Sequence, residues 1–316
     1  MKRQKISVVI PCYNSEKMIE TVVDQVLEAI SERKTFEYEI ILVNDGSKDS
    51  TWNVIHDMAI KNPHIIAINF SRNFGQHSAL MAAYRAVTGD IIVGLDDDGE
   101  HDPKEIYMLI DKLFEGFDYV CAYYEINQSK FRSLGTRVNN LMATILIDKP
   151  KEVDFSSYYA MKRFVIEEII RYRQPYPYVG GLVLRATRNI GTVPLVRHKR
   201  LCGKSGYSTR KMIKLWFNGF TAFSVKPLRV ATGLGVLSAL IGFIGAIVLI
   251  IKRLFFLNYV PGYASTIVCI IFFCGMIMML LGIIGEYVGR IYISINNAPQ
   301  YVIRDQVGGD NNEENY

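Results

Sequence analysis

Cysteine is scarce in this chain, and its positions follow no metal-binding spacing. The five cysteines are Cys12, Cys121, Cys202, Cys269 and Cys274. Their number is odd, and no pair has the short spacing of a zinc site. The simplest interpretation is that they are free thiols in a reducing compartment.

Two common phosphate-binding motifs are also missing. No GxGxxG follows the first predicted strand, and GxxxxGK[ST] does not occur in the 316 residues. The first motif is typical of NAD-binding domains and the second of P-loop proteins. The sequence therefore gives little support for an NAD-binding domain or for a P-loop protein.

Long uncharged runs are confined to the last third of the chain. Residues 230–251 and 264–285 each form a run of 22 residues without a charge. Each run exceeds the roughly 20 residues needed to cross a bilayer. The connector between them contains Pro261-Gly262, a turn signal. These features predict a transmembrane hairpin; two buried core helices are disfavoured because neither run has a polar face.

The expected topology follows from the start of the chain and from its charges. Residues 6–10 are far shorter than the apolar region of a signal peptide, so we expect residues 1–225 to stay in the cytoplasm. Two spans would return the C-terminus to the same side. The basic residues favour this orientation. They are Arg210, Lys211, Lys214, Lys226 and Arg229 before the first run, against Lys252 and Arg253 in the connector. The net charge of +5 fits a protein that faces anionic lipid and phosphate ligands.

The first hundred residues alternate between strand and helix patterns. Strands are predicted at 6–11, 38–43, 65–70 and 91–95, and helices at 16–31, 51–60 and 76–86. Repeated βα units imply an α/β fold with a mostly parallel sheet and helices on both faces.

Three carboxylates follow the fourth predicted strand. Asp96 and Asp98 are two residues apart, so their side chains can face the same way in an extended backbone. Ligands of open α/β sheets bind at the carboxyl ends of strands. Two carboxylates there suit Mg²⁺ or Mn²⁺ shared with a diphosphate. The alternative is a solvated acidic turn before the helix that Pro103 opens.

Polar residues also follow the first two strands, in Pro11-Cys12-Tyr13-Asn14 and in Asn44-Asp45-Gly46-Ser47. This is the expected place for a nucleotide pocket. Asp45 could accept a hydrogen bond from a uracil N–H or a ribose hydroxyl. The alternative for Asp45 is a local Asx turn.

These motifs resemble those of a known family. Residues 9–14 (VIPCYN), residues 43–47 (VNDGS) and the Asp96-x-Asp98 triplet are similar to the signature of glycosyltransferase family 2, which has the GT-A fold. Residues 71–79 (SRNFGQHSA), 203–207 (GKSGY) and 285–292 (GEYVGRIY) resemble the polyprenyl-phosphate glycosyltransferases. That group includes bactoprenol glucosyltransferases, dolichol-phosphate mannose synthases and undecaprenyl-phosphate formamido-arabinose transferases. The resemblance covers about residues 5–304.

The resemblance implies a domain organisation. A cytoplasmic GT-A catalytic domain would span 1–206, juxtamembrane amphipathic helices 207–229, the transmembrane hairpin 230–285 and a cytoplasmic tail 286–316. The mixture of apolar and basic residues over 207–223 is typical of a helix in the membrane interface. The expected location is the bacterial inner membrane, with several spans and the catalytic domain in the cytoplasm.

The resemblance also implies residue roles on the donor side. The nucleotide sugar would contact Pro11, Tyr13, Asn14, Asp45, Asp96 and Asp97. Asp96 and Asp98 would bind Mg²⁺ or Mn²⁺. Asp98 and Asp154 would be the catalytic residues, with Asp154 near the acceptor; its alternative is a loop cap. Asn44 and Glu100 depart from the commoner Asp and Gln of the family.

The acceptor side is basic. A lipid phosphate carries roughly −1.5 to −2 charge and needs cations or donors to bind it. The candidates are Arg132, Ser133 and Arg137 in one segment and Arg200, Lys204 and Ser205 in another. The alternative is a basic face toward anionic membrane. The histidines His77, His101 and His198 are expected to pack or lie at the surface rather than bind metal.

The implied reaction is an inverting transfer of a sugar, most simply from a UDP-sugar, to polyprenyl (undecaprenyl) phosphate. One alternative is a processive polysaccharide synthase, but its Gln-x-x-Arg-Trp motif is absent: Thr51 precedes Trp52, and Leu215 precedes Trp216. The other is a non-catalytic membrane adaptor or lipid-translocating subunit, which the retained aspartates disfavour.

Small residues recur four apart in both apolar runs, as in Ser238-x-x-x-Gly242-x-x-x-Ala246 and Gly285-x-x-x-Gly289. Such spacing lets membrane helices approach closely. We expect a homo-oligomer, with a tetramer as one possibility, and no nucleic acid partner. The alternative is that these residues join only the two helices of the hairpin.

Overall fold

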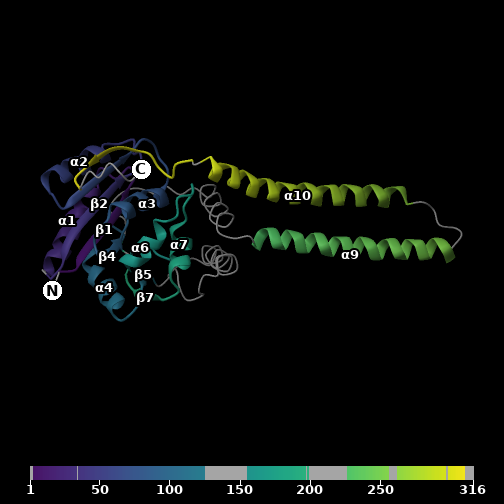
Figure 1. Ribbon diagram of the computed structural model, residues 1–316, viewed down its shortest axis with the longest axis horizontal. Helices are drawn as coiled ribbons and strands as arrows, with labels where there is room; N and C mark the ends of the chain where they lie inside the picture. Colours follow the sequence, from purple (N-terminus) through teal and green to yellow (C-terminus); the bar gives the residue numbers. More distant parts are fainter. Residues whose placement is uncertain are drawn as a thin grey trace. The chain divides into compact units, whose positions relative to one another are not determined.

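The computed structural model describes residues 3–33, 35–124, 155–196, 198, 226–255, 262–296 and 298–309. The chain divides into two compact units, residues 1–219 with 298–316 and residues 220–297 (Figure 1). Seven residues predicted to contact the acceptor lie outside the described residues. They are Arg132, Ser133, Arg137, Asp154, Arg200, Lys204 and Ser205. The predicted interfacial helix over 207–223 lies outside them as well.

The first unit is built on one mixed sheet. Its strands are β1 Lys5–Cys12, β2 Glu37–Asn44, β3 Ile65–Phe70, β4 Ile91–Gly94, β5 Tyr119–Tyr123, β6 Tyr159–Lys162, β7 Ile190–Pro194 and β8 Ile303–Val307. Their spatial order is β7-β5-β6-β4-β1-β2-β3-β8. The four predicted strands form the parallel centre, β4-β1-β2-β3. Strands β6 and β8 join antiparallel, so the sheet is mixed around a parallel centre and the predicted α/β fold is confirmed.

Helices connect the strands. They are α1 Ile19–Glu32, α2 Thr51–Lys61, α3 Gln76–Ala86, the short 3₁₀ helix η1 Pro103–Glu105, α4 Ile106–Phe114, α6 Arg163–Ile169 and α7 Val179–Ala186. Helix α1 starts three residues later than predicted because residues 15–18 form a turn, in which the Ser15 carbonyl accepts from the N–H groups of Met18 and Ile19. Just before α2, the carboxylate of Asp49 accepts from the N–H and the hydroxyl of Thr51, the first residue of the helix.

The core lies on both faces of the central strands, which are therefore almost continuously apolar. On one face, Val8 and Ile10 of β1 pack in a cluster with buried residues of α1, α2 and α4. On the other face, α3 lies against β1 and β2. Gly94, the last residue of β4, has no room for a side chain, because a Cβ there would lie 2.2 Å from the Tyr159 ring. The sheet therefore holds the ends of β1, β2 and β4 in fixed register.

The strand β8 follows the second unit in sequence but belongs to the sheet of the first. It pairs with β3, and the preceding segment packs nearby: Tyr301 stacks on Phe70 with ring centroids 5.1 Å apart. Arg85 of α3 donates to the Tyr301 hydroxyl and to the Gln300 side chain. Residues 298–309, predicted to belong to a tail, are thus part of the first unit.

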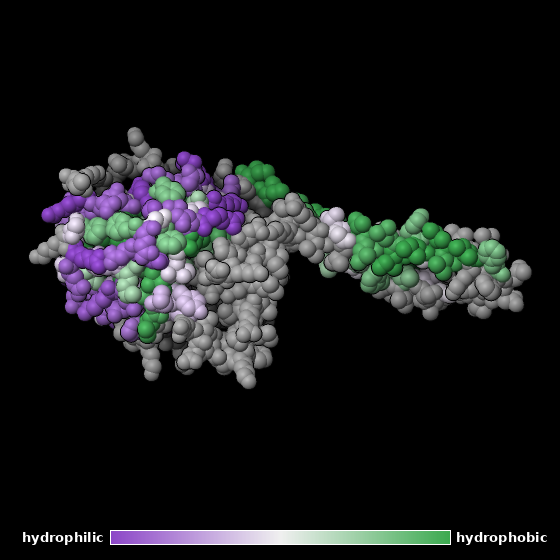
Figure 2. Space-filling model, turned by 90° about the horizontal axis from the view of Figure 1, so that it is seen from below, coloured by the Kyte–Doolittle hydropathy of each residue, from purple (hydrophilic) through white to green (hydrophobic). Residues whose placement is uncertain are grey.

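The second unit contains two long helices, α9 Lys226–Phe255 and α10 Tyr263–Ile295, which contain the two uncharged runs. Their outer surfaces are largely hydrophobic (Figure 2), with exposed side chains that include Leu240, Phe243, Ile277 and Met278. Within the described residues, 272–293 is long and apolar enough to cross a membrane, whereas the apolar segment of α9, 231–245, is shorter. The two-span topology stays a prediction.

Candidate active site

The loops after β1, β2 and β4 are hydrogen bonded to one another. Parallel pairing places Cys12 beside Asn44, so the next residues of both strands emerge together. The Asn14 N–H donates to Ser47 Oγ over 2.9 Å, and the Tyr13 N–H donates to Asp97 Oδ2 over 3.0 Å. The polar residues predicted to gather at this edge of the sheet therefore do so.

Asp96 is the most constrained carboxylate at this edge. Its Oδ1 accepts from Gln76 Nε2 over 2.7 Å, and its Oδ2 accepts from Ser157 Oγ over 2.5 Å. His101 Nε2 lies 3.6 Å from the same Oδ2. Burial raises the pKa of Asp96, but the nearby His101 and the hydrogen bonds from Ser157 and Gln76 lower it by more, so the net pKa falls below its usual value. Asp96 is therefore held as an oriented anion.

The next two aspartates have different surroundings. Asp97 accepts from the Tyr13 N–H, and burial, with the charges of Asp96 and Asp98, raises its pKa to about 6. Asp98 Oδ1 accepts from the Glu100 N–H over 3.0 Å, within a turn in which Gly99 has a φ of 71°. Asp97 thus joins the loop after β1, while Asp96 contacts α3 and the segment before β6.

These residues fit a divalent cation. Asp96 and Asp98 would supply hard oxygen ligands, and the lowered pKa of Asp96 favours its ionised form. In the part of the chain that the structure describes, no group of three or more His, Cys, Asp or Glu side chains is arranged to hold a metal. A cation here would take its other ligands from a diphosphate and water, which is how Mg²⁺ is commonly bound.

Asp45 holds the loop that leads into α3. Its Oδ1 accepts from the Phe74 N–H over 2.6 Å, and its Oδ2 accepts from the Gly75 N–H over 2.9 Å. Burial raises the pKa of Asp45 to about 6. The Asx-turn alternative is wrong for Asp45; it is the Asn44 side-chain oxygen that accepts from the Ser47 N–H.

Gly46 allows the loop before α3 to lie directly against the loop after β2. Its φ is 61°, which L side chains rarely adopt, and a Cβ would lie 2.4 Å from the carbonyl carbon of Arg72. Asp45 and Gly46 together therefore fix residues 72–75 and hence the position of Gln76.

Three residues that contact Asp96 were not among the predicted site residues. Gln76 lies in the string at 71–79 and Ser157 lies just before β6, and neither has a predicted role. His101 was expected to pack, and it does: it stacks on Tyr158, and its Nδ1 bonds the Tyr124 hydroxyl. Its Nε2 also reaches Ser157 Oγ over 3.1 Å. In the sequence, only the position of His101, five residues after Asp96 and just before the helix that Pro103 opens, indicates that it lies near Asp96.

His77 and His198 make contacts with residues other than Asp96. His77 makes an edge-to-face contact with Tyr178, and its Nδ1 is buried without a hydrogen-bond partner among the described residues. Burial lowers its pKa to about 4, which keeps the ring neutral. At His198, the backbone N–H donates to the Glu100 carbonyl. The packing role expected for His77 is confirmed.

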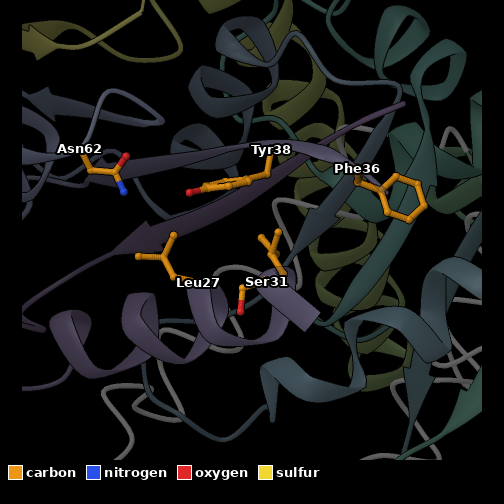
Figure 3. A pocket seen from close by; sticks show the side chains of 6 residues that line it. Leu27, Ser31, Phe36, Tyr38 and Asn62 are labelled. Atoms are coloured by element: carbon orange, nitrogen blue, oxygen red, sulfur yellow. The ribbon is translucent and has the colours of Figure 1, made fainter. Parts of the chain in front are cut away.

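A separate pocket of about 380 Å³ lies elsewhere in the first unit (Figure 3). Its lining residues are Leu27, Ile30, Ser31, Phe36, Tyr38 and Asn62. Tyr38 is near the start of β2, whereas Asn44 and the candidate site are at its end. The pocket is therefore distinct from the site, and the described residues that line it include no carboxylate or cation.

Comparison with known families agrees with the fold. Residues 7–170 match the model of glycosyl transferase family 2, and residues 226–291 match the model of the GtrB C-terminal hairpin. The chain belongs to glycosyltransferase family 2.

Curated relatives match along almost the whole chain. A bactoprenol glucosyl transferase of Shigella phage SfII is 34% identical over 313 residues, covering 97% of this chain and 99% of that one. An undecaprenyl-phosphate 4-deoxy-4-formamido-L-arabinose transferase of Yersinia enterocolitica is 33% identical over 318 residues, covering 99% and 97%. An uncharacterized glycosyltransferase of Bacillus subtilis, YkcC, is 32% identical over 307 residues, covering 96% and 95%.

Solved structures share the fold. Glucosyl-3-phosphoglycerate synthase from Mycobacterium tuberculosis, in complex with Mn²⁺ and UDP-glucose, aligns with a TM-score of 0.51 at 22% identity, covering 69% of this chain and 79% of that one. A second mycobacterial protein aligns with a TM-score of 0.53 at 18% identity, covering 70% and 75%. At these identities the likeness concerns the fold alone. The expected GT-A fold is confirmed.

Proposed function

We propose that this protein transfers a sugar from a nucleotide sugar to a polyprenyl phosphate, with undecaprenyl phosphate as the acceptor and UDP as the nucleotide. The observation that carries the proposal is the oriented, ionised Asp96, held beside the loops that follow β1 and β2. The relatives named for bactoprenol and undecaprenyl phosphate match this chain over nearly its whole length, which supports the acceptor class.

The donor would lie across the loops after β1 and β2. Tyr13 is 46% exposed although the preceding Cys12 is fully buried, so its ring is available to stack on a nucleotide base. Pro11, Asn14 and Asp45 would form the rest of the nucleotide pocket. UDP is the first nucleotide to test because a solved structure with this fold is in complex with UDP-glucose.

The reaction needs help mainly with its leaving group. The acceptor phosphate is already an anionic nucleophile, so direct attack on the anomeric carbon would invert it and release the nucleoside diphosphate. A divalent metal, when bound, supplies charge neutralisation for that diphosphate. Asp96 and Asp98 would hold it, while Gln76 and Ser157 keep Asp96 oriented. Asp154 and the predicted lipid-phosphate residues, Arg132, Ser133, Arg137, Arg200, Lys204 and Ser205, stay part of this proposal.

The acceptor is a lipid, and the second unit fits that requirement. The exposed apolar side chains of α9 and α10 suit contact with acyl chains rather than water. We propose that residues 230–285 anchor the protein in the bacterial inner membrane as a hairpin, with 1–206 as catalytic domain and 207–229 in the interface. The small residues in these helices would hold a homo-oligomer together.

The test is transfer of labelled sugar into lipid. A panel of UDP-sugars is incubated with undecaprenyl phosphate and the purified full chain, and the organic phase is analysed. We expect one sugar to become chloroform-soluble. Label in a water-soluble polymer would instead indicate a processive synthase, and absence of transfer with every donor would indicate a non-catalytic adaptor.

A further inference from the structure

A charged side chain of the strand β8 is linked by hydrogen bonds to the loop after β1, although the two are far apart along the chain. Asp305 of β8 lies opposite Asn69 of β3 in the antiparallel register. Asn69 Nδ2 donates to Asp305 Oδ2 over 2.9 Å, although 236 residues separate the two. The side chain of Asp305 is about half exposed, whereas Asn69 is nearly buried, so the bond leads from the edge of the sheet inward.

From Asn69 a continuous row of hydrogen bonds reaches the loop after β1. Asn44 Nδ2 donates to Asn69 Oδ1 over 2.8 Å. Ser47 Oγ then donates to Asn44 Oδ1 over 2.5 Å. Finally, the backbone N–H of Asn14 donates to Ser47 Oγ over 2.9 Å. Asn14 has a φ of 54°, in the left-handed region that asparagine adopts more readily than most other non-glycine residues.

Asp305 sets the direction of the amide bonds in this row from one end, and the N–H of Ser47, which also donates to the Asn44 carbonyl, supports the same orientation of Asn44 from the other end. An ionised carboxylate only accepts hydrogen bonds, so the NH₂ group of Asn69 must face it. The carbonyl oxygen of Asn69 then faces Asn44, which must present its own NH₂ group. The carbonyl oxygen of Asn44 then faces Ser47 and accepts a hydrogen bond from its hydroxyl. Ser47 Oγ therefore offers a lone pair to the N–H of Asn14.

We propose that Asp305 is a positioning residue for the donor site: through Asn69, Asn44 and Ser47 it holds the Tyr13-Asn14 loop in the shape that binds the nucleotide. This inference rests on the proposed function, since it assigns that loop to the nucleotide. It also explains why residue 44 is Asn in this chain. An Asp at position 44 would leave Asn69 between two carboxylates, and its single NH₂ group could face only one.

A charge-conserving exchange tests the polarity of the row. In Asn44→Asp, one carboxylate faces the carbonyl of Asn69. In the double variant Asn44→Asp/Asp305→Asn, the side-chain amide of Asn69 can rotate by half a turn. Its NH₂ group then donates to residue 44, and its carbonyl oxygen accepts from the new amide at residue 305. Asp305→Asn alone is mild, because that amide can present its oxygen to Asn69. Asp57→Asn, at an exposed carboxylate of α2, is the matched control.

The measurements use the full chain in detergent: UDP affinity by calorimetry, and KM for the nucleotide sugar and for undecaprenyl phosphate. We expect Asn44→Asp to weaken UDP binding by at least about tenfold, the range expected for a buried polar group that loses its partner. The KM for the lipid and kcat should stay within about threefold, and the double variant should regain most of the UDP affinity. A role in stability alone would instead lower the fraction of active protein and leave both KM values unchanged.

Two results would overturn the inference. One is an Asn44→Asp variant that binds UDP as the wild type does; the other is a double variant no better than Asn44→Asp. Either result with an active wild type would leave the proposed function intact. A wild type that neither binds UDP nor transfers sugar would overturn the proposed function, and the positioning role with it.

Discussion

Gln76 and Asp96 are joined by a hydrogen bond in which Gln76 Nε2 donates to Asp96 Oδ1 over 2.7 Å. Gln76 is the first residue of α3, and Asp96 follows β4. The bond forms because Asp45 and Gly46 hold the loop immediately before α3. The orientation of the candidate metal ligand thus depends on residues after β2 as well as on its own turn.

Changing Gln76 should affect the chemical step. In Gln76→Ala, Asp96 loses one of its two side-chain donors, and we expect kcat to fall about tenfold. In Gln76→Glu, a second carboxylate would face Asp96 and raise its pKa, so the loss should be larger. Single-turnover rates with saturating donor measure both effects. Gln25→Glu on α1 is a control for the added charge, and a fully active Gln76→Glu would contradict the orienting role.

Removing the charge of Asp96 should abolish transfer. Asp96→Asn keeps the shape but not the anion, and a metal that neutralises a leaving diphosphate contributes several kcal/mol, so we expect at least about a hundredfold loss. EDTA should give a similar loss, reversed by Mg²⁺ or Mn²⁺. Asp111→Asn, at an exposed ion pair with Arg33, serves as the control. Normal turnover of Asp96→Asn in EDTA would exclude the metal site.

Substitution of Gly46 and of Gly75 distinguishes the cost of backbone strain from the cost of a steric clash. Gly46→Ala combines a positive φ with a Cβ 2.4 Å from Arg72, whereas Gly75→Ala has a φ of 96° but no atom within 4 Å. Backbone strain costs on the order of 1–3 kcal/mol at each site, and the steric conflict adds to it only at Gly46. We therefore expect a larger drop in thermal unfolding midpoint for Gly46→Ala. Equal drops would mean that the loop at 72–73 moves away without cost.

The raised pKa of Asp45 predicts a pH dependence of stability. Burial raises this pKa from 3.8 to about 6, so the folded state binds the proton more tightly than the unfolded state. The stabilising contribution of protonated Asp45 is present at low pH and is lost as the pH rises through about 6. The unfolding free energy of the wild type should therefore fall, relative to Asp45→Asn, between roughly pH 4 and pH 6.5.

Denaturant unfolding of both proteins across this range measures that difference. Asp97, whose pKa is also about 6, is present in both and cancels. A difference that is constant or grows with pH would mean that Asp45 is ionised at no cost in the folded protein.

Local sequence patterns determined the central elements of this protein. The strand Ile65–Phe70 and the helix Gln76–Ala86 have the predicted bounds, because buried apolar runs and helical periodicity are properties of neighbouring residues. The gathering of Tyr13, Asn44 and Asp96 at one edge also followed from sequence, since parallel strands carry their ends to the same side.

Tertiary structure alone decided which side chains face one another at that edge. The strand β8 is short and carries Arg304, Asp305 and Gln306, so its sequence has no clear strand pattern; it forms because β3 offers an unpaired edge. Gln76, His101 and Ser157 likewise meet at Asp96 only after the sheet has brought distant loops together. Hydrogen bonds of this kind depend on the separation of atoms in space, which short-range periodicity does not encode.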